Sequence, residues 1–93
     1  MRVTHNEEKH FFEAFTDEGE HMGKITYVPK DGDIAANHTW TEKKFRNQGV
    51  AQAMLDAMAD YARQSGKKII PICSYVIGAF EREAARYRDV MKG

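Results

Sequence analysis

The sequence lacks most of the features that mark specialised classes of protein. It has one cysteine in 93 residues, so no disulfide can form within the chain. This cysteine and the four scattered histidines do not show the spacing of metal ligands, and no metal is expected. No run of about eighteen apolar residues occurs, and residues 1–7 contain no signal-peptide core. These absences predict a cytoplasmic protein with no membrane partner.

Net charge is absent as well. The 14 basic and 14 acidic side chains cancel, so no general field attracts a polyanion, and a nucleic-acid partner is not expected. Hydrophobic residues make up 42% of the chain, which is enough for a globular core. Because domains usually have at least this many residues, we expect residues 1–93 to form a single domain.

The first 41 residues show the alternation that is typical of strands. It predicts strands over residues 11–15, 22–28 and 34–41, with the second strand ended by Pro29. Turn-forming residues occupy 17–19 and 30–33, so the connections are short and the three strands should be antiparallel.

Beyond residue 47 the apolar residues recur at steps of three and four, which predicts a helix over residues 48–65 that ends at Gly66. Its buried stripe consists of Val50, Ala51, Met54, Leu55, Met58, Tyr61 and Ala62. A strand over 68–73 and a last helix from about residue 74 follow. The alternating charges Glu81, Arg82, Glu83, Arg86, Arg88 and Asp89 are interpreted as a solvated face of that last helix.

The segment 34–73 is thus a strand–helix–strand unit, which should be parallel and right-handed. Together with the antiparallel strands it predicts an α/β fold with a mixed sheet. Pro71 cannot donate to a sheet ladder. We therefore expect the last strand to splay away from its parallel neighbour there and to leave a wedge for an extended ligand.

The turn over residues 46–51 has the properties of a phosphate site. It enters a helix, whose first N–H groups are unpaired and favour an anion. Gly49 and Ala51 are small, Asn47 tolerates a left-handed backbone, and Arg46 adds a cation. Neither a P-loop nor the dinucleotide fingerprint is present. Read alone, the turn leaves open that Gly49 only eases the entry into the helix.

Two longer stretches narrow this interpretation. Residues 41–55, with their Arg-x-x-Gly-x-Ala core, resemble the signature of the GNAT acetyltransferase superfamily. His38-Thr39 before the turn, and the run Pro71-Ile72-Cys73-Ser74-Tyr75 after the helix, resemble a compact single-domain branch of that superfamily. The resemblance covers about residues 10–87 and implies a minimal version of the GNAT-like acyl-CoA N-acyltransferase fold.

The resemblance also implies a binding site for acetyl-CoA. The pyrophosphate would be held by backbone amides of Arg46, Asn47, Gln48, Gly49, Val50, Ala51 and Gln52. The pantetheine arm would lie in the wedge that begins near Thr41, where Tyr75 is a candidate contact. The sequence departs from the family at Asn47, usually Gly, and at Thr41, usually an aliphatic residue. Trp40 stands where the branch often has Glu, so no carboxylate base is available at that position.

Cys73 and His38 are the candidate catalytic residues. Cys73 precedes a helix, which favours the thiolate. It is interpreted as an acyl acceptor, as an acid or a redox-sensitive contact beside the thioester, or as a small buried side chain. His38 is interpreted either as the general base for the amine or as a packed strand histidine. Tyr75 is equally interpretable as an anchor of the last helix. His5, His10 and His21 are assigned no role.

The implied function is transfer of an acetyl group from acetyl-CoA to an amine. The chain is too short for extra elements around the acceptor, so the acceptor site is either open, as suits a protein tail, or completed by a second subunit in a homodimer. The alternatives are a non-catalytic acyl-CoA-binding or sensing module and a plain interaction domain.

Overall fold

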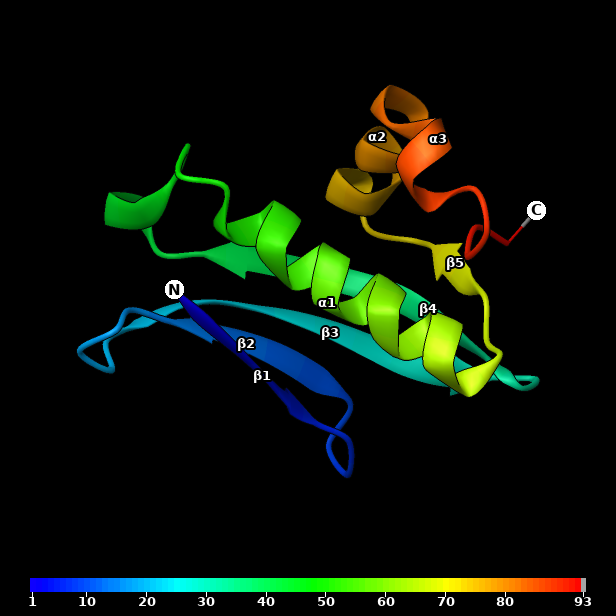
Figure 1. The fold of residues 1–93 in the computed structure, drawn as a ribbon, viewed down its shortest axis with the longest axis horizontal. Coiled ribbons are helices and arrows are strands. Elements are labelled where there is room, and N and C mark those ends of the chain that lie inside the picture. The colour runs from blue at the N-terminus through cyan, green and yellow to red at the C-terminus, as the bar shows by residue number, and fades with distance from the viewer. Residues whose placement is uncertain (93) are drawn as a thin grey trace.

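The computed structural model describes residues 1–92, which form a five-stranded sheet whose strands follow the order of the sequence (Figure 1). The strands are β1 (Arg2–Asn6), β2 (Phe11–Phe15), β3 (His21–Lys30), β4 (Asp33–Thr41) and β5 (Ile69–Pro71). The first four pair antiparallel, whereas β5 pairs parallel to β4. The predicted α/β fold with a mixed sheet is confirmed.

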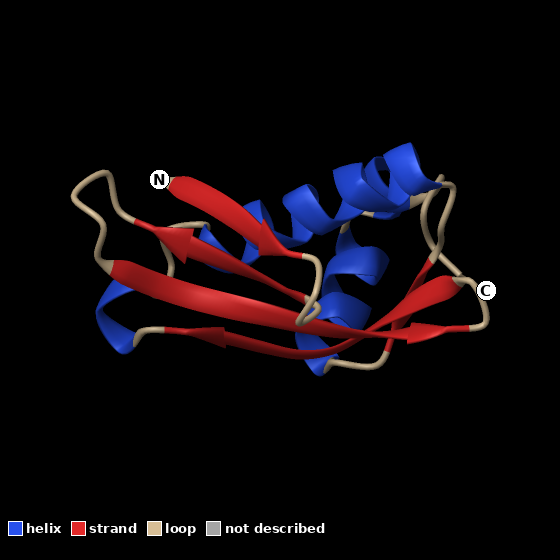
Figure 2. Ribbon diagram, turned by 90° about the horizontal axis from the view of Figure 1, so that it is seen from below, coloured by secondary structure: helices blue, strands red, loops and turns tan. Residues whose placement is uncertain are grey.

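The helices are α1 (Val50–Ser65), α2 (Ser74–Arg82) and α3 (Ala84–Tyr87), and the 3-10 turn η1 (Lys43–Phe45) precedes α1. The helix predicted over 48–65 thus begins at Val50, and it ends as predicted at Gly66, whose φ is 67°. Figures 1 and 2 show α1 running along one face of the twisted sheet. Met54, Leu55 and Met58 on α1 are fully buried. Each such side chain stabilises the fold by about 1.5–3 kcal/mol.

The strand β1 is absent from the prediction, which starts the sheet at residue 11. Its sequence, Arg-Val-Thr-His-Asn, has a single apolar residue and therefore no hydrophobic alternation. In the structure His5 takes an inward position in place of an apolar side chain. Its ring stacks on Phe12 with the centroids 4.0 Å apart, and Nε2 lies 2.6 Å from Tyr27 Oη. The aromatic packing and the hydrogen bond together replace the missing hydrophobic pattern.

The turn predicted over residues 30–33 joins β3 to β4. Asp31 and Gly32 have φ of 52° and 85°, the left-handed values that a two-residue type I′ hairpin requires. β3 continues past Pro29, where the strand was expected to end. Proline is tolerated because Pro29 faces Ile34 outside the hydrogen-bonded pairs, and the N–H of Ile34 bonds Lys68 O on the other side.

β4 carries one extra residue relative to β3. Thr26 pairs with His38 and Tyr27 pairs with Ala36, so Asn37 is left as a bulge. A bulge shifts the alternation of side chains by one position, because successive residues of a strand point to opposite faces.

The shift decides which side chains of β4 face α1. Before the bulge Ile34 does so and is buried. After the bulge Thr39 pairs with a buried residue of β3, and cross-strand partners share a face, so Thr39 and Thr41 point toward α1. His38 and Trp40 lie on the opposite face of the sheet, and both are exposed.

β5 pairs with β4 only over residues 34–36 of β4. The N–H groups of Ile72 and Cys73 both donate to the carbonyl of Ala36, at 3.1 and 2.9 Å. Within residues 1–92, no strand pairs with positions 37–41 of β4 on that side. The splay predicted from Pro71 is confirmed, and it leaves the backbone of the second half of β4 free along that edge.

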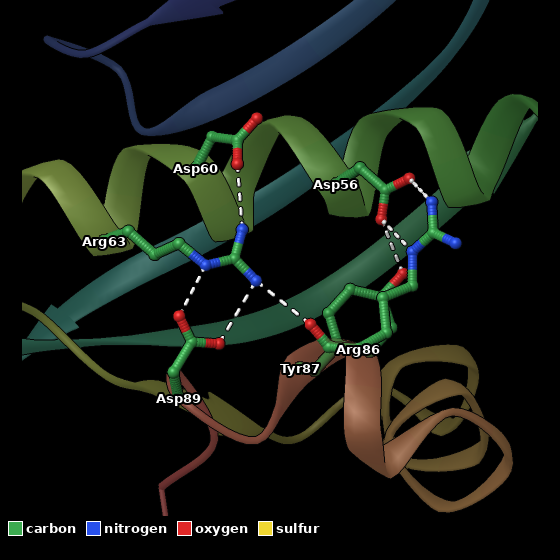
Figure 3. Close-up of polar contacts among 6 residues, drawn as sticks. All are labelled: Asp56, Asp60, Arg63, Arg86, Tyr87 and Asp89. Carbon is green, nitrogen blue, oxygen red and sulfur yellow. Dashed lines mark hydrogen bonds and ion pairs between the residues drawn. The ribbon is translucent and has the colours of Figure 1, made fainter.

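Polar contacts attach the C-terminal helices to α1 (Figure 3). Asp56 accepts hydrogen bonds from Arg86 and from the hydroxyl of Tyr87, each at 2.7 Å. Arg63 donates to Asp89 at 2.6 Å. The charged residues of the last helix are exposed, as predicted, but Arg86 and Asp89 belong to an ion-pair network with α1 rather than to a freely solvated face.

The chain continues beyond α3 along β5. The N–H of Ile69 donates to Val90 O at 2.6 Å, and the N–H of Lys92 donates to Ile69 O at 2.9 Å.

Among the described residues, no helix combines the length and the apolar character needed to span a bilayer.

Candidate active site

The turn before α1 has the left-handed backbone that the sequence suggested. Asn47 has a φ of 65° and Gly49 a φ of 78°, and Gly49 caps the helix without a side-chain hydrogen bond. The N–H of Ala53 bonds Gly49 O at 3.0 Å. The helix itself supplies no acceptor for the N–H groups of the residues before Ala53 in its first turn. These donors and the positive end of the helix dipole are available to an external anion.

These donors open on a cleft of about 480 Å³ between α1, the end of β4 and the start of α2. Its lining residues are Thr39, Trp40, Thr41, Phe45, Arg46, Asn47, Gly49, Val50, Ala51, Gln52 and Tyr75. All the residues predicted to bind the cofactor are in this set except Gln48. The side-chain amide of Gln48 instead donates to Lys44 O at 3.3 Å and closes the turn from outside.

Gly23 on β3 was not singled out from the sequence, although it shapes the same region. A Cβ at this position would lie 2.6 Å from Trp40 O and 3.2 Å from Met54 Cε. The end of β4 and the first half of α1 therefore approach β3 as closely as they do only because residue 23 has no side chain. A glycine inside a predicted strand is the signal that could have identified this position.

Cys73 lies just before α2 and beside the cleft. Its Sγ is 3.3 Å from Thr39 Oγ1, and the side chain is half-buried. Burial alone would raise the pKa of the thiol. The hydrogen bond with the Thr39 hydroxyl, and then those with the backbone at the start of α2, outweigh burial and hold the pKa of Cys73 below its ordinary value. The contacts favour a thiolate at this position.

His38 does not reach the cleft. The bulge at Asn37 turns its side chain to the face of the sheet opposite α1, where it pairs with Thr26. Trp40 lies on the same face as His38, and its ring stacks on His21 with the centroids 5.7 Å apart. The structure thus brings Cys73 and Thr39 together and separates them from His38 by the sheet.

Tyr75 stands in the first turn of α2 and lines the cleft opposite α1. Burial is the main reason that the pKa of its hydroxyl is raised; Arg82 lowers it, and Asp56 and Glu83 raise it further. The group is therefore a neutral hydrogen-bond donor over the physiological pH range.

The charges around the cleft are mixed. Arg46 lines it, and Lys43 and Lys44 precede it on η1. Lys44 forms an ion pair with Glu20. On the opposite wall, the side-chain amide of Gln52 donates to Glu83 Oε2 at 2.9 Å. In the described part of the chain, no three His, Cys, Asp or Glu side chains are placed to hold a metal ion.

The chain is similar to known proteins both in sequence and in structure. Residues 11–90 match the family model of the GCN5-related N-acetyltransferases. A solution structure of a Staphylococcus aureus protein described as a GCN5-like N-acetyltransferase is 30% identical, with a TM-score of 0.77, over 99% of this chain and 88% of that one. A search of curated proteins gives no match.

Two crystal structures share the fold at lower identity. Nourseothricin acetyltransferase is 19% identical with a TM-score of 0.61, over 77% of this chain and 46% of that one. The ribosomal-protein-alanine N-acetyltransferase of Brucella melitensis biovar Abortus 2308 is 20% identical with a TM-score of 0.57, over 77% and 59%. This chain thus spans about half the length of these two proteins. The match over residues 11–90 and the Staphylococcus structure establish that the chain belongs to the GCN5-related N-acetyltransferase family, and they confirm the predicted enzyme class, an N-acetyltransferase.

Proposed function

We propose that this protein transfers an acetyl group from acetyl-CoA to an amine. The observation that carries the proposal is the first turn of α1, whose free N–H groups open on a cleft of about 480 Å³ that also borders the splayed end of β4. The pyrophosphate of acetyl-CoA would accept hydrogen bonds from this turn, with Arg46 as the nearest cation. Gly49 suits this role because nothing lies within 4 Å of the place where its Cβ would be.

The pantetheine arm would lie along the second half of β4. Residues 37–41 have no strand partner on the side of β5 in the described chain, so their backbone groups can bond the amides of the arm. An N–H group near Thr41 could then polarise the thioester carbonyl. The amine lone pair attacks the carbonyl carbon, a C–N bond forms and the C–S bond breaks. The nitrogen loses a proton and CoA leaves as a thiol, so positioning of the two reactants supplies much of the rate.

Of the roles considered for Cys73, that of acyl acceptor is the one proposed. A lowered pKa favours the thiolate, which attacks a thioester, over the thiol, which would donate a proton. In this version acetyl-CoA first acylates Sγ and the amine then attacks the Cys73 thioester. The proton-transfer role of His38 stays a prediction, and it requires the amine to approach from the face of the sheet opposite α1.

The cleft is open to solvent, which is consistent with a protein tail or a small amine as the acceptor. It is also consistent with an acceptor site that a second subunit completes in a homodimer. A non-catalytic acyl-CoA-binding module would need the first turn of α1 but not Cys73, so it remains the alternative to the enzyme.

Two measurements test the proposal. Calorimetry with CoA should detect micromolar binding, and the substitution Gly49→Val should weaken it at least tenfold, because valine is strained at a φ of 78° and occupies the approach to the helix. Release of free thiol from acetyl-CoA, across a panel of amines and peptides, should show turnover with at least one acceptor. Absence of CoA binding would refute both the enzyme and the binding module, whereas binding without turnover would leave the module.

A further inference from the structure

The contact between Gln52 and Glu83 joins the cleft to the C-terminal helices. Gln52 is in the first turn of α1 and lines the cleft, and its Nε2 donates to Glu83 Oε2 at 2.9 Å. Glu83 is the single residue between α2 and α3, and it is exposed. A carboxylate is therefore fixed beside the turn that would receive the phosphates of CoA.

The negative charge of Glu83 is not neutralised by a direct partner. Across residues 1–92, it forms no ion pair, and the one side-chain hydrogen bond that it accepts comes from an uncharged amide. Asp56, the nearby acid on α1, differs in this respect because it is paired with Arg86 at 2.7 Å. Glu83 is the least of the groups that raise the pKa of Tyr75, after burial and Asp56, and Tyr75 lines the cleft.

We infer that Glu83 limits the affinity of the cleft for the phosphate-bearing part of CoA. This inference rests on the proposed function and concerns the same site. A pyrophosphate at the first turn of α1 is repelled by the Glu83 carboxylate, and it competes with that carboxylate for the Gln52 amide. The result is weaker binding of CoA and faster release of the product than the helix N-terminus and Arg46 alone would give.

The test compares Glu83→Gln with the wild-type chain by calorimetry. The substitution removes the charge and keeps an oxygen that can accept from Gln52. Because exposed charges are partly screened, we expect CoA to bind about threefold more tightly. Pantetheine, which has no phosphate, should bind both proteins equally, and the gain for CoA should shrink as salt is added. Glu81→Gln, at an exposed position in the last turn of α2 with no side-chain hydrogen bond or ion pair among the described residues, is the matched control and should leave the affinity unchanged.

The outcomes separate this inference from the proposed function. If wild-type protein binds CoA and Glu83→Gln binds it equally or more weakly, the role of Glu83 is refuted while the CoA site stands. A gain that appears also for pantetheine, or in Glu83→Ala but not in Glu83→Gln, would assign the effect to packing or to the hydrogen bond and would refute a charge effect. If the wild-type protein does not bind CoA, the proposed function and this inference fall together.

Discussion

The contact between Cys73 and Thr39 joins two residues 34 positions apart in the sequence, at 3.3 Å. A motif that includes Cys73 cannot indicate this neighbour, because the splay of β5 from β4 sets the distance between them. Thr39 was known from the sequence only as a residue next to His38. In the structure it is the side chain that most favours the thiolate of Cys73.

This contact predicts the reactivity of the thiol. Thr39→Val keeps the shape of the side chain and removes the hydroxyl, so the pKa of Cys73 should rise toward its ordinary value. The rate of alkylation by iodoacetamide, followed by intact mass from about pH 6 to about pH 10, should therefore shift to higher pH. Thr41 lines the same cleft but is not the hydrogen-bond partner of Sγ. The control substitution Thr41→Val should therefore leave the pH dependence of alkylation unchanged. An unchanged profile in Thr39→Val would show that the hydroxyl does not stabilise the thiolate.

Between elements, the packing of α3 on α1 depends on a few polar groups. The side chain of Tyr87 is fully buried, and its hydroxyl donates to Asp56 at 2.7 Å. Asp56→Ala would leave this hydroxyl buried without an acceptor, which costs about 1–3 kcal/mol. Arg63 and Asp89 are exposed, so breaking their ion pair should change stability little.

We therefore expect Asp56→Ala to lower the midpoint of urea unfolding clearly and Arg63→Met to lower it only slightly. Tyr87→Phe removes the hydroxyl together with its need for an acceptor and should fall between them. Equal losses in Asp56→Ala and Arg63→Met would contradict the distinction between the buried and the exposed parts of this network.

The elements that could be predicted are those whose residues follow a simple period. The helix over 48–65 has a continuous apolar stripe. Pro71 lacks the N–H group that a parallel ladder requires, so the strand pairing must end near it. β1 could not be predicted, because aromatic stacking of His5 on Phe12 replaces an apolar pattern there. The bulge at Asn37 has no local signal, since only the pairing with β3 reveals the extra residue.

The candidate site was predictable to the extent that it is contiguous. The turn from Arg46 to Gln52 lines the cleft except at Gln48, and its backbone shape was predictable because a turn before a helix is a local structure. Thr39 and Phe45, which line the cleft, and Gly23, which lets β4 and α1 approach β3, were missed because their contacts arise from tertiary packing. The position of His38 on the opposite face could not be predicted, because uninterrupted alternation from Ile34 and Ala36 points it toward α1 and only the bulge reverses it.

The whole molecule should show a pH-dependent stability that comes in part from His5. Burial lowers the pKa of His5 in the folded protein; Glu7 raises it and His10 lowers it, and the lowering prevails. The unfolded chain therefore takes up this proton at a higher pH than the folded one. The contribution of His5 to stability is present above the ordinary value of 6.5 and is lost as the pH falls below it.

The midpoint temperature of thermal unfolding should thus decrease as the pH is lowered from about 7.5 to about 5.5. His5→Gln should reduce this decrease. His38→Gln, at an exposed histidine on the outer face of the sheet, should keep the wild-type dependence. The same slope in His5→Gln as in the wild-type protein would mean that other groups cause the pH dependence.

The bulge in β4 makes the wall of the cleft depend on strand pairing as much as on residue identity. If Asn37 paired with Thr26 in a regular ladder instead of bulging, His38 and Trp40 would face α1, while Thr39 and Thr41 would turn to the opposite face. Cys73 would lose its threonine neighbour without any substitution in the motif around it. Two relatives that share every residue of the Arg46–Gln52 turn could therefore present different chemistry to the same bound thioester, if only one of them had this bulge in β4.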